Sequence, residues 1–194
     1  KRHRVQLQLQ ALLHISVKEG LADVVGSLPK YFDRKKYDVR VMLPKYACME
    51  ERFLGKLQAV TEFYVQLGWR KQYAGILKAN ANGIQYYFVD NEFYFAGDHP
   101  YGEIYQDVEK FAFFSKAVLD AVEHINFWPD VIHCNDWQTG LIPVFLEHFY
   151  RSKERYQKIR TVFSIHNIRF QGRWKIPEVK DVTILPHTGF TSEG

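Results

Sequence analysis

The sequence predicts an α/β protein built on a mainly parallel sheet, with one β-hairpin inserted at the sheet edge. Short apolar segments typical of strands alternate with longer segments of helical period. A glycine lies between the first such strand and the helical segment after it, as in the first unit of an open parallel sheet. A β-rich block containing the turn signal NANG (80–83) interrupts this alternation. Together these observations predict a Rossmann-like domain with helices on both faces of its sheet.

The first unit reads strand, loop, helix, strand. Apolar residues alternate with glutamines over residues 5–9, which predicts a strand there. A helical apolar stripe follows, made of Leu21, Val24, Val25, Leu28 and Phe32. Gly26 and Pro29 fall inside the stripe, so we expect a kinked or weak helix. The segment YDVRVMLP (37–44) then predicts a buried strand that ends at a proline.

The middle of the chain is rich in strand-forming residues. Residues 57–66 and 73–89 have this character, and NANG predicts a tight turn within the second segment. The aromatic clusters at 85–95 and 148–150 have compositions that could stack on sugar rings. Aromatic residues in such segments more often pack in the core or within a hairpin, so this alternative stays open.

The last third returns to the alternation of helices and strands. Residues 105–124 carry one apolar stripe and predict a long amphipathic helix. A short buried strand is expected at 129–136, followed by a helix with an internal proline at 137–150. The segment 159–167 predicts the next strand of the sheet.

Composition excludes several classes of protein. With 46% hydrophobic residues among 194, the chain can bury a sizeable core, and we expect one domain over residues 1–194. The net charge is +4, and the basic runs at 1–4 and 34–36 are too short to predict nucleic-acid binding. Cys48 and Cys134 are too few for a disulfide framework or a zinc site, which favours a reducing compartment. No apolar stretch approaches the roughly 18 residues of a membrane span.

Polar residues follow two predicted strands at the same relative place. Asp136 comes at the end of one strand and His166 at the end of the next. Ligands of open parallel sheets bind outside the carboxyl ends of the strands, so we expect a polar-ligand cleft there. Taken singly, Asp136 could instead cap a helix that starts near Trp137, and His166 could be a packed histidine that is hydrogen-bonded to the backbone.

Several catalytic motifs are absent from the sequence. Neither G-x-x-x-x-G-K-[ST] nor G-x-G-x-x-G occurs, so the phosphate loops of ATPases and dinucleotide-binding enzymes are missing. No D-x-D pair is available to hold a divalent metal on a sugar nucleotide. The G-x-S-x-G elbow of serine hydrolases is missing as well.

Six segments, taken in order, resemble the N-terminal domain of bacterial glycogen synthases and plant starch synthases. They are GLADVVGSLPK, DVRVMLPKY, DNEFYF, YQDVEKFAFFSKAVLDA, WPDVIHCNDWQTGLIPVFL and FSIHNIRFQG. The likeness covers residues 17–190, while residues 1–16 are atypical of the family's opening strand. It implies one half of a GT-B fold, in which two Rossmann-like domains face each other across a deep cleft. Residues 1–194 would form the N-terminal, acceptor-side domain.

The resemblance also implies an activity. Enzymes of this family transfer glucose from ADP-glucose to the non-reducing end of an α-1,4-glucan with retention, in the cytoplasm or, in plants, in the plastid. No metal or other cofactor is implied, because helix N-termini and basic side chains meet the phosphate charge. The choice between ADP-glucose and UDP-glucose stays open. The C-terminal nucleotide-binding domain is absent from residues 1–194, so we expect no catalysis by this chain alone.

Individual residues take roles from the resemblance. His166 of SIHN resembles the histidine that contacts the transferring glucose, and Asp136 of CNDW resembles an aspartate of the cleft. We expect both to be catalytic. The donor-binding and substrate-binding residues implied are Lys18, Gly20, Asp23, Tyr101 and Asn167. Gly20 would let the backbone approach the donor phosphates, because a side chain there would block them.

The glycine loop departs from the family pattern Lys-x-Gly-Gly-Leu-Ala-Asp. When the Gly-Leu-Ala-Asp parts are aligned, the family lysine falls on Val17 and its first glycine on Glu19. Glu19 would place a carboxylate beside a diphosphate, which is electrostatically unfavourable. Lys18 is displaced by one position, and whether it replaces the family lysine stays open.

Two other functions remain alternatives. The chain could be a non-catalytic glucan-binding module that uses its aromatic hairpin, with Tyr86 or Tyr87 as binding residues. It could also be half of another GT-B glycosyltransferase with a different sugar-nucleotide donor.

Overall fold

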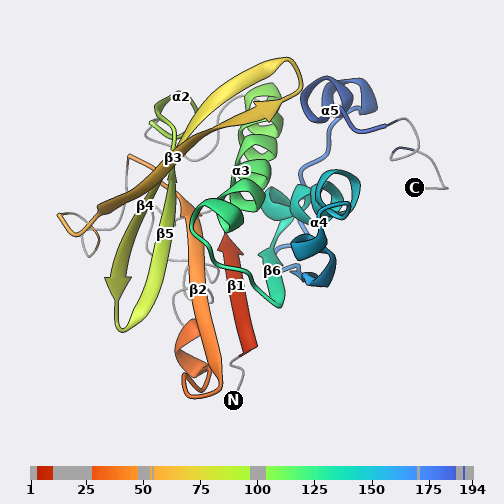
Figure 1. The fold of residues 1–194 in the computed structure, drawn as a ribbon. Coiled ribbons are helices and arrows are strands. Elements are labelled where there is room, and N and C mark those ends of the chain that lie inside the picture. Colours follow the sequence, from red (N-terminus) through yellow and green to blue (C-terminus); the bar gives the residue numbers. More distant parts are fainter. Residues whose placement is uncertain are drawn as a thin grey trace.

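A mixed β-sheet forms the centre of the molecule (Figure 1). The computed structural model describes residues 4–10, 28–47, 53, 55–96, 104–169, 171–186 and 190, and only the backbone of 4–10 and 104–106. Seven strands of the described residues belong to the sheet: β1 (Arg4–Gln10), β2 (Tyr37–Pro44), β3 (Gln58–Leu67), β4 (Arg70–Ala81), β5 (Ile84–Asp90), β6 (Val131–Asn135) and β7 (Arg160–Ser164). They lie in the order β3-β4-β5-β2-β1-β6-β7.

The strand order reverses at β1. This strand pairs with β2 on one side and with β6 on the other, and all pairs from β5 to β7 are parallel. Gln10 at the end of β1 is the register partner of Asn135 at the end of β6. Such a reversal opens a crevice at the carboxyl ends of the two strands. This topology confirms the expected α/β class, and it brings together the strand ends at which a cleft was expected.

Two strands of the parallel sheet, β2 and β6, lie in apolar segments that are largely buried. β2 matches the predicted strand, and its last four residues, 41–44, are buried. β6 has four buried residues out of five, as expected for a strand covered on both faces. β1 and β7 also lie where strands were predicted.

The β-rich block forms a meander. Asn82 and Gly83 both have positive φ (54° and 73°), the backbone of the tight turn that NANG predicts, and they join β4 to β5. β5 also pairs with β2, so it belongs to the parallel sheet and the inserted hairpin consists of β3 and β4. Tyr86 and Tyr87 of β5 are only 2% and 6% exposed, so the alternative in which they bind a glucan is wrong.

One long helix covers the sheet between the hairpin and the C-terminal helices (Figure 1). α3 (Ile104–His124) matches the predicted amphipathic helix. The other helical elements are α2 (Glu92–Phe95), η1 (Trp137–Thr139), α4 (Leu141–Phe145), η2 (Leu146–Tyr150), η3 (Glu154–Lys158) and α5 (Ile176–Thr183). None of the helices in the described ranges has the length and apolar character that crossing a membrane requires.

Two helices differ from the sequence prediction. The helix expected at 137–150 is divided into a 3-10 turn, a short α-helix and a π-helical turn, and Pro143, which lacks an N–H donor, lies in its middle. α5 was not predicted. Of the kinked helix expected after β1, residues 28–31 are helical, and its earlier part lies outside the described residues.

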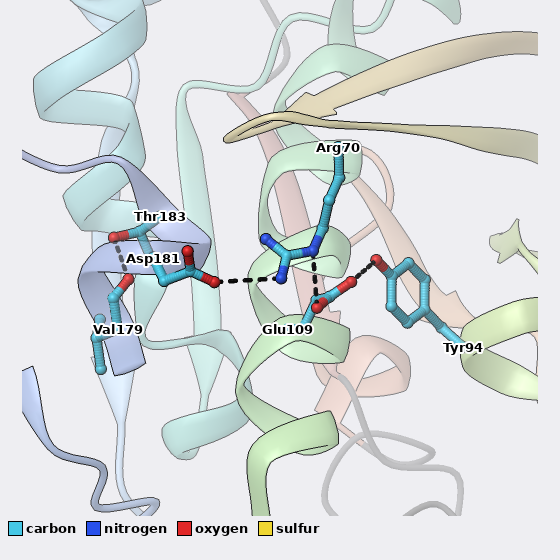
Figure 2. Close-up of polar contacts among 6 residues, drawn as sticks. All are labelled: Arg70, Tyr94, Glu109, Val179, Asp181 and Thr183. Carbon is cyan, nitrogen blue, oxygen red and sulfur yellow. Dashed lines mark hydrogen bonds and ion pairs between the residues drawn. The ribbon is translucent and has the colours of Figure 1, made fainter. Parts of the chain in front are cut away.

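Arg70 ties the hairpin to two helices (Figure 2). Its Nε lies 3.0 Å from Glu109 of α3, and its Nη2 lies 3.2 Å from Asp181 of α5. The second carboxylate oxygen of Glu109 accepts a 2.6 Å hydrogen bond from the Tyr94 hydroxyl of α2. Burial and then this hydrogen bond raise the pKa of Tyr94, so its hydroxyl remains a donor. The Arg70 and Glu109 side chains are only 15% and 18% exposed, so each depends on the other for charge compensation.

The substitution Glu109→Ala should destabilise the fold, because it leaves the buried guanidinium of Arg70 without its main counter-charge. We expect a loss of about 2 kcal/mol in the free energy of unfolding. Urea unfolding of the 194-residue chain, followed by tryptophan fluorescence, measures it. The matched control is Asp181→Ala, whose side chain is 61% exposed and should cost less than about 0.5 kcal/mol. Equal losses for the two variants would contradict this account of Arg70.

Candidate active site

The candidate site lies where β6 and β7 end side by side. Asn135 and Ser164, the last residues of the two strands, are register partners. Asp136 follows β6 directly, and the segment 165–167 follows β7. The predicted juxtaposition of Asp136 and His166 is therefore present.

Asp136 holds the backbone of the segment after β7. Its Oδ1 accepts hydrogen bonds from the N–H groups of His166 (2.7 Å) and Asn167 (3.2 Å). Its own N–H donates to the Ser164 carbonyl at 2.9 Å. The residue is 4% exposed and has φ 57° and ψ 175°, a backbone conformation almost confined to glycine. Asp136 lies at the N-cap position of η1, but its side chain makes no capping hydrogen bond, so the alternative in which this side chain caps the helix is wrong.

His166 presents its ring at the surface of this edge. The ring is exposed, so the alternative of a packed core histidine is also wrong. Its Nε2 lies 2.9 Å from Asn135 Oδ1. Because an amide oxygen only accepts hydrogen bonds, Nε2 is the donor in this pair, and Nδ1 is the other ring nitrogen. Asn135 thus fixes the ring while Asp136 fixes the backbone.

A second histidine lies beneath this pair. His133 precedes Asn135 by two residues on β6, so both side chains lie on the same face of the sheet. The Nε2 atom of His133 is 2.7 Å from Ser164 Oγ. Burial, and secondarily the charge of His166, lowers the pKa of His133. This environment favours neutral His133 as a structural support for the site.

An aromatic cluster packs beside the site. The rings of Trp137 and Trp174 lie 5.2 Å apart between centroids, and Phe111 of α3 meets Trp137 edge-on at 5.0 Å. Gly172 fits between the two tryptophans with φ 58°. A Cβ at this position would overlap the Trp137 ring and lie 2.8 Å from Trp174. The segment after His166 can therefore run between Trp137 and Trp174 only because residue 172 is a glycine.

The structure brings together three of the seven predicted site residues: Asp136, His166 and Asn167. The other four, Lys18, Gly20, Asp23 and Tyr101, lie outside the described residues. Sequence reasoning missed Asn135 and Gly172. A polar residue at the end of a buried strand, and a glycine in the aromatic-rich segment RFQGRW, were the available signals. Within the described ranges, no group of three or more His, Cys, Asp or Glu residues could hold a metal ion.

Comparisons with known proteins place the chain in a family. A family model described as the starch synthase catalytic domain matches residues 14–194. The chain belongs to this family. The resemblance found in the sequence is thereby confirmed.

Named relatives and a solved structure agree with this membership. Glycogen synthase of Lachnospira eligens is 55% identical over 174 residues, which cover 90% of this chain and 36% of that protein. Glycogen synthase of Lachnoclostridium phytofermentans is 51% identical, with 90% and 37% covered. The catalytic domain of starch synthase IV from Arabidopsis thaliana, solved with ADP and acarbose, is 28% identical and superposes with a TM-score of 0.81. That match covers 92% of this chain and 37% of the other, and confirms half of a GT-B fold.

Gly172→Ala should destabilise the fold more than a glycine substitution that meets only backbone strain. Gly55 is the matched control, because it also has positive φ (73°) but has no atom within 4 Å of where an added Cβ would lie. We expect Gly55→Ala to cost about 1 kcal/mol from strain. Gly172→Ala should cost about 3 kcal/mol, because displacement of Trp137 adds to the strain. Urea unfolding measures both, and equal losses would contradict the packing described.

Acidification should remove stability that depends on neutral His133. Its pKa is lower in the folded chain than the ordinary value of 6.5, so the unfolded chain binds the proton more readily. The stabilisation is complete above about pH 6.5 and is lost as the pH falls through the lower, folded-state pKa. When the pH is lowered from about 7.5 to about 5, the free energy of unfolding of His133→Gln should therefore fall less than that of the wild type. His148→Gln, at an exposed histidine, should behave as the wild type.

Proposed function

We propose that the chain is the N-terminal, acceptor-side domain of a glycogen or starch synthase. The full-length enzyme would transfer glucose from ADP-glucose to the non-reducing end of an α-1,4-glucan, with retention. The observation that carries this proposal is the exposed ring of His166, fixed through Asn135 and Asp136 at the strand ends of a member of this family. The chain spans only 36–37% of the relatives' length, so we assign the activity to the full-length protein.

The ligands proposed are a nucleotide sugar and an α-glucan. The related starch synthase IV was solved with ADP and acarbose, which supports an ADP-linked donor and a glucan acceptor. Lys18, Gly20, Asp23, Tyr101 and Asn167 remain the predicted donor-binding and substrate-binding residues. Among them, Asn167 lies within the described site, where its backbone N–H donates to Asp136.

His166 and Asp136 have different tasks in this proposal. The exposed ring of His166 would contact the transferring glucose through a hydrogen bond that strengthens as charge develops at the anomeric carbon. Nε2 is hydrogen-bonded to Asn135 Oδ1, so Nδ1 is the ring atom that would contact the sugar. The Oδ1 of Asp136 is engaged by two backbone N–H groups. We therefore assign Asp136 a positioning role instead of the catalytic role expected from the sequence.

The compartment proposed is the cytoplasm. The relatives named above are bacterial glycogen synthases, which favours this assignment over a plastid. Burial raises the pKa of the Cys134 thiol to about 12, so this cysteine stays protonated and unreactive. Such a thiol is compatible with a reducing compartment.

Glucosyl transfer by the full-length protein tests the proposal. We expect transfer from ADP-glucose to maltooligosaccharide, with UDP-glucose as the comparison donor. His166→Ala should lower kcat by at least about 100-fold, because it removes a contact realised in the transition state. Asp136→Asn keeps an acceptor oxygen in place and should retain more activity than Asp136→Ala, as a positioning role requires. The control is His148→Ala, at an exposed histidine of η2, which should leave kcat unchanged.

Two results would overturn parts of this assignment. Transfer by residues 1–194 alone would show that the activity does not need the rest of the enzyme. Full activity of His166→Ala would remove the proposed contact with glucose and leave the site without its central residue.

A further inference from the structure

The inserted hairpin has a polar and aromatic face that no other described element covers. We call it the outer hairpin face, and it consists of Glu62, Tyr64 and Gln66 of β3 with Lys71 and Tyr73 of β4. Side chains alternate along each strand, so Phe63, Val65 and Leu67 point the other way and are buried. All five members of the outer face are exposed.

The two tyrosines form the centre of this face. Tyr64 and Tyr73 are direct cross-strand partners, and their rings meet edge to face with centroids 6.2 Å apart. Tyr64 is 62% exposed and Tyr73 is 40% exposed. Two rings of this size on neighbouring strands offer adjoining aromatic surfaces to solvent.

Gly75 explains how the Tyr73 ring is placed. A Cβ at Gly75 would lie 2.8 Å from the Tyr73 hydroxyl oxygen and 3.3 Å from two of its ring carbons. Because glycine has no side chain, the ring can lie along the sheet over this residue. A side chain at this position would displace the Tyr73 ring, which is 40% exposed.

Polar groups border the aromatic surface. The Tyr73 hydroxyl donates to Glu62 Oε2 at 3.2 Å, and the Lys71 ammonium lies 5.0 Å from the Tyr64 ring centroid. A carboxylate that accepts hydrogen bonds and an ammonium that donates them thus lie beside the rings. A sugar ring has an apolar C–H face and a rim of hydroxyl groups, and this combination of side chains complements both parts.

We propose that the outer hairpin face binds a segment of an α-glucan chain at a distance from the site of transfer. The ligand class rests on the proposed function, in which the acceptor is such a polymer. β4 and β6 lie four positions apart in the sheet, about 20 Å at the usual strand spacing. A glucan held here would raise the effective concentration of its chain ends near His166. Five side chains are few for a protein partner, since a stable interface uses roughly 20–30 residues on each side.

Native gel electrophoresis of the full-length protein, with glycogen in the gel, tests this binding. The double variant Tyr64→Ala, Tyr73→Ala should bind glycogen about tenfold more weakly than the wild type. Its KM for glycogen should rise, while kcat and the KM values for ADP-glucose and short maltooligosaccharides stay unchanged. Tyr73→Phe retains the ring and should bind like the wild type. Tyr31→Ala removes a tyrosine that is 83% exposed elsewhere on the surface, and should also bind normally.

Several outcomes would overturn the inference. If glycogen retards the double variant as much as the wild type, the outer hairpin face does not bind glucan. The same conclusion follows if Tyr31→Ala loses as much retardation as the double variant. A change in oligomeric state without a change in retardation would identify a protein interface there instead.

The test also separates this inference from the proposed function. His166→Ala should lose transfer but keep its retardation by glycogen. Tyrosine-dependent retardation in a wild-type enzyme that transfers no glucose would refute the proposed function and leave the glucan-binding face standing. Glucose transfer without tyrosine-dependent retardation would refute the glucan-binding face and leave the proposed function standing.

Discussion

The candidate site depends on one carboxylate, that of Asp136. Its backbone conformation costs about 1–3 kcal/mol in a residue other than glycine. That conformation brings Oδ1 within hydrogen-bond distance of the N–H groups of His166 and Asn167. Hydrogen bonds to a charged group contribute about 1.5–3 kcal/mol each, so two of them offset the strain. The position of His166 is therefore set by a strained residue at the end of the neighbouring strand.

Much of the fold could be predicted because the signals are local. The strand at 37–44 has both its apolar content and its terminating proline in one short segment, and its observed ends agree with the prediction. The segment expected to be one helix at 137–150 is helical from its predicted first residue, but no local pattern predicts its division into a 3-10 turn, an α-helix and a π-helical turn. α5 carried readable signals, with Pro177 in its first turn and Glu178 accepting a hydrogen bond from the Lys175 N–H.

The sequence was sufficient to predict where the site lies in the fold, but not which residues contact one another within it. Strand ends pointed to Asp136 and His166, since topology alone brings those ends together. The hydrogen bond between His166 Nε2 and Asn135 Oδ1 joins residues 31 apart and requires the register of β6 and β7, which no local pattern contains. The role of Gly172 likewise depends on two tryptophans that only the fold brings to it.

The hairpin uses its two faces differently, and each depends on the other. Phe63 of the inner face stacks on His124 of α3 at 4.2 Å between ring centroids, while Arg70 near the hairpin turn is bound to α3 and α5. These contacts fix the hairpin at two separate points along its length, so it has little freedom to rotate against the sheet. The position of Tyr64 and Tyr73 relative to the end of β6 is thereby fixed. A polymer bound on a rigid surface keeps its free end within a limited volume, which is the condition under which an accessory contact assists transfer at His166.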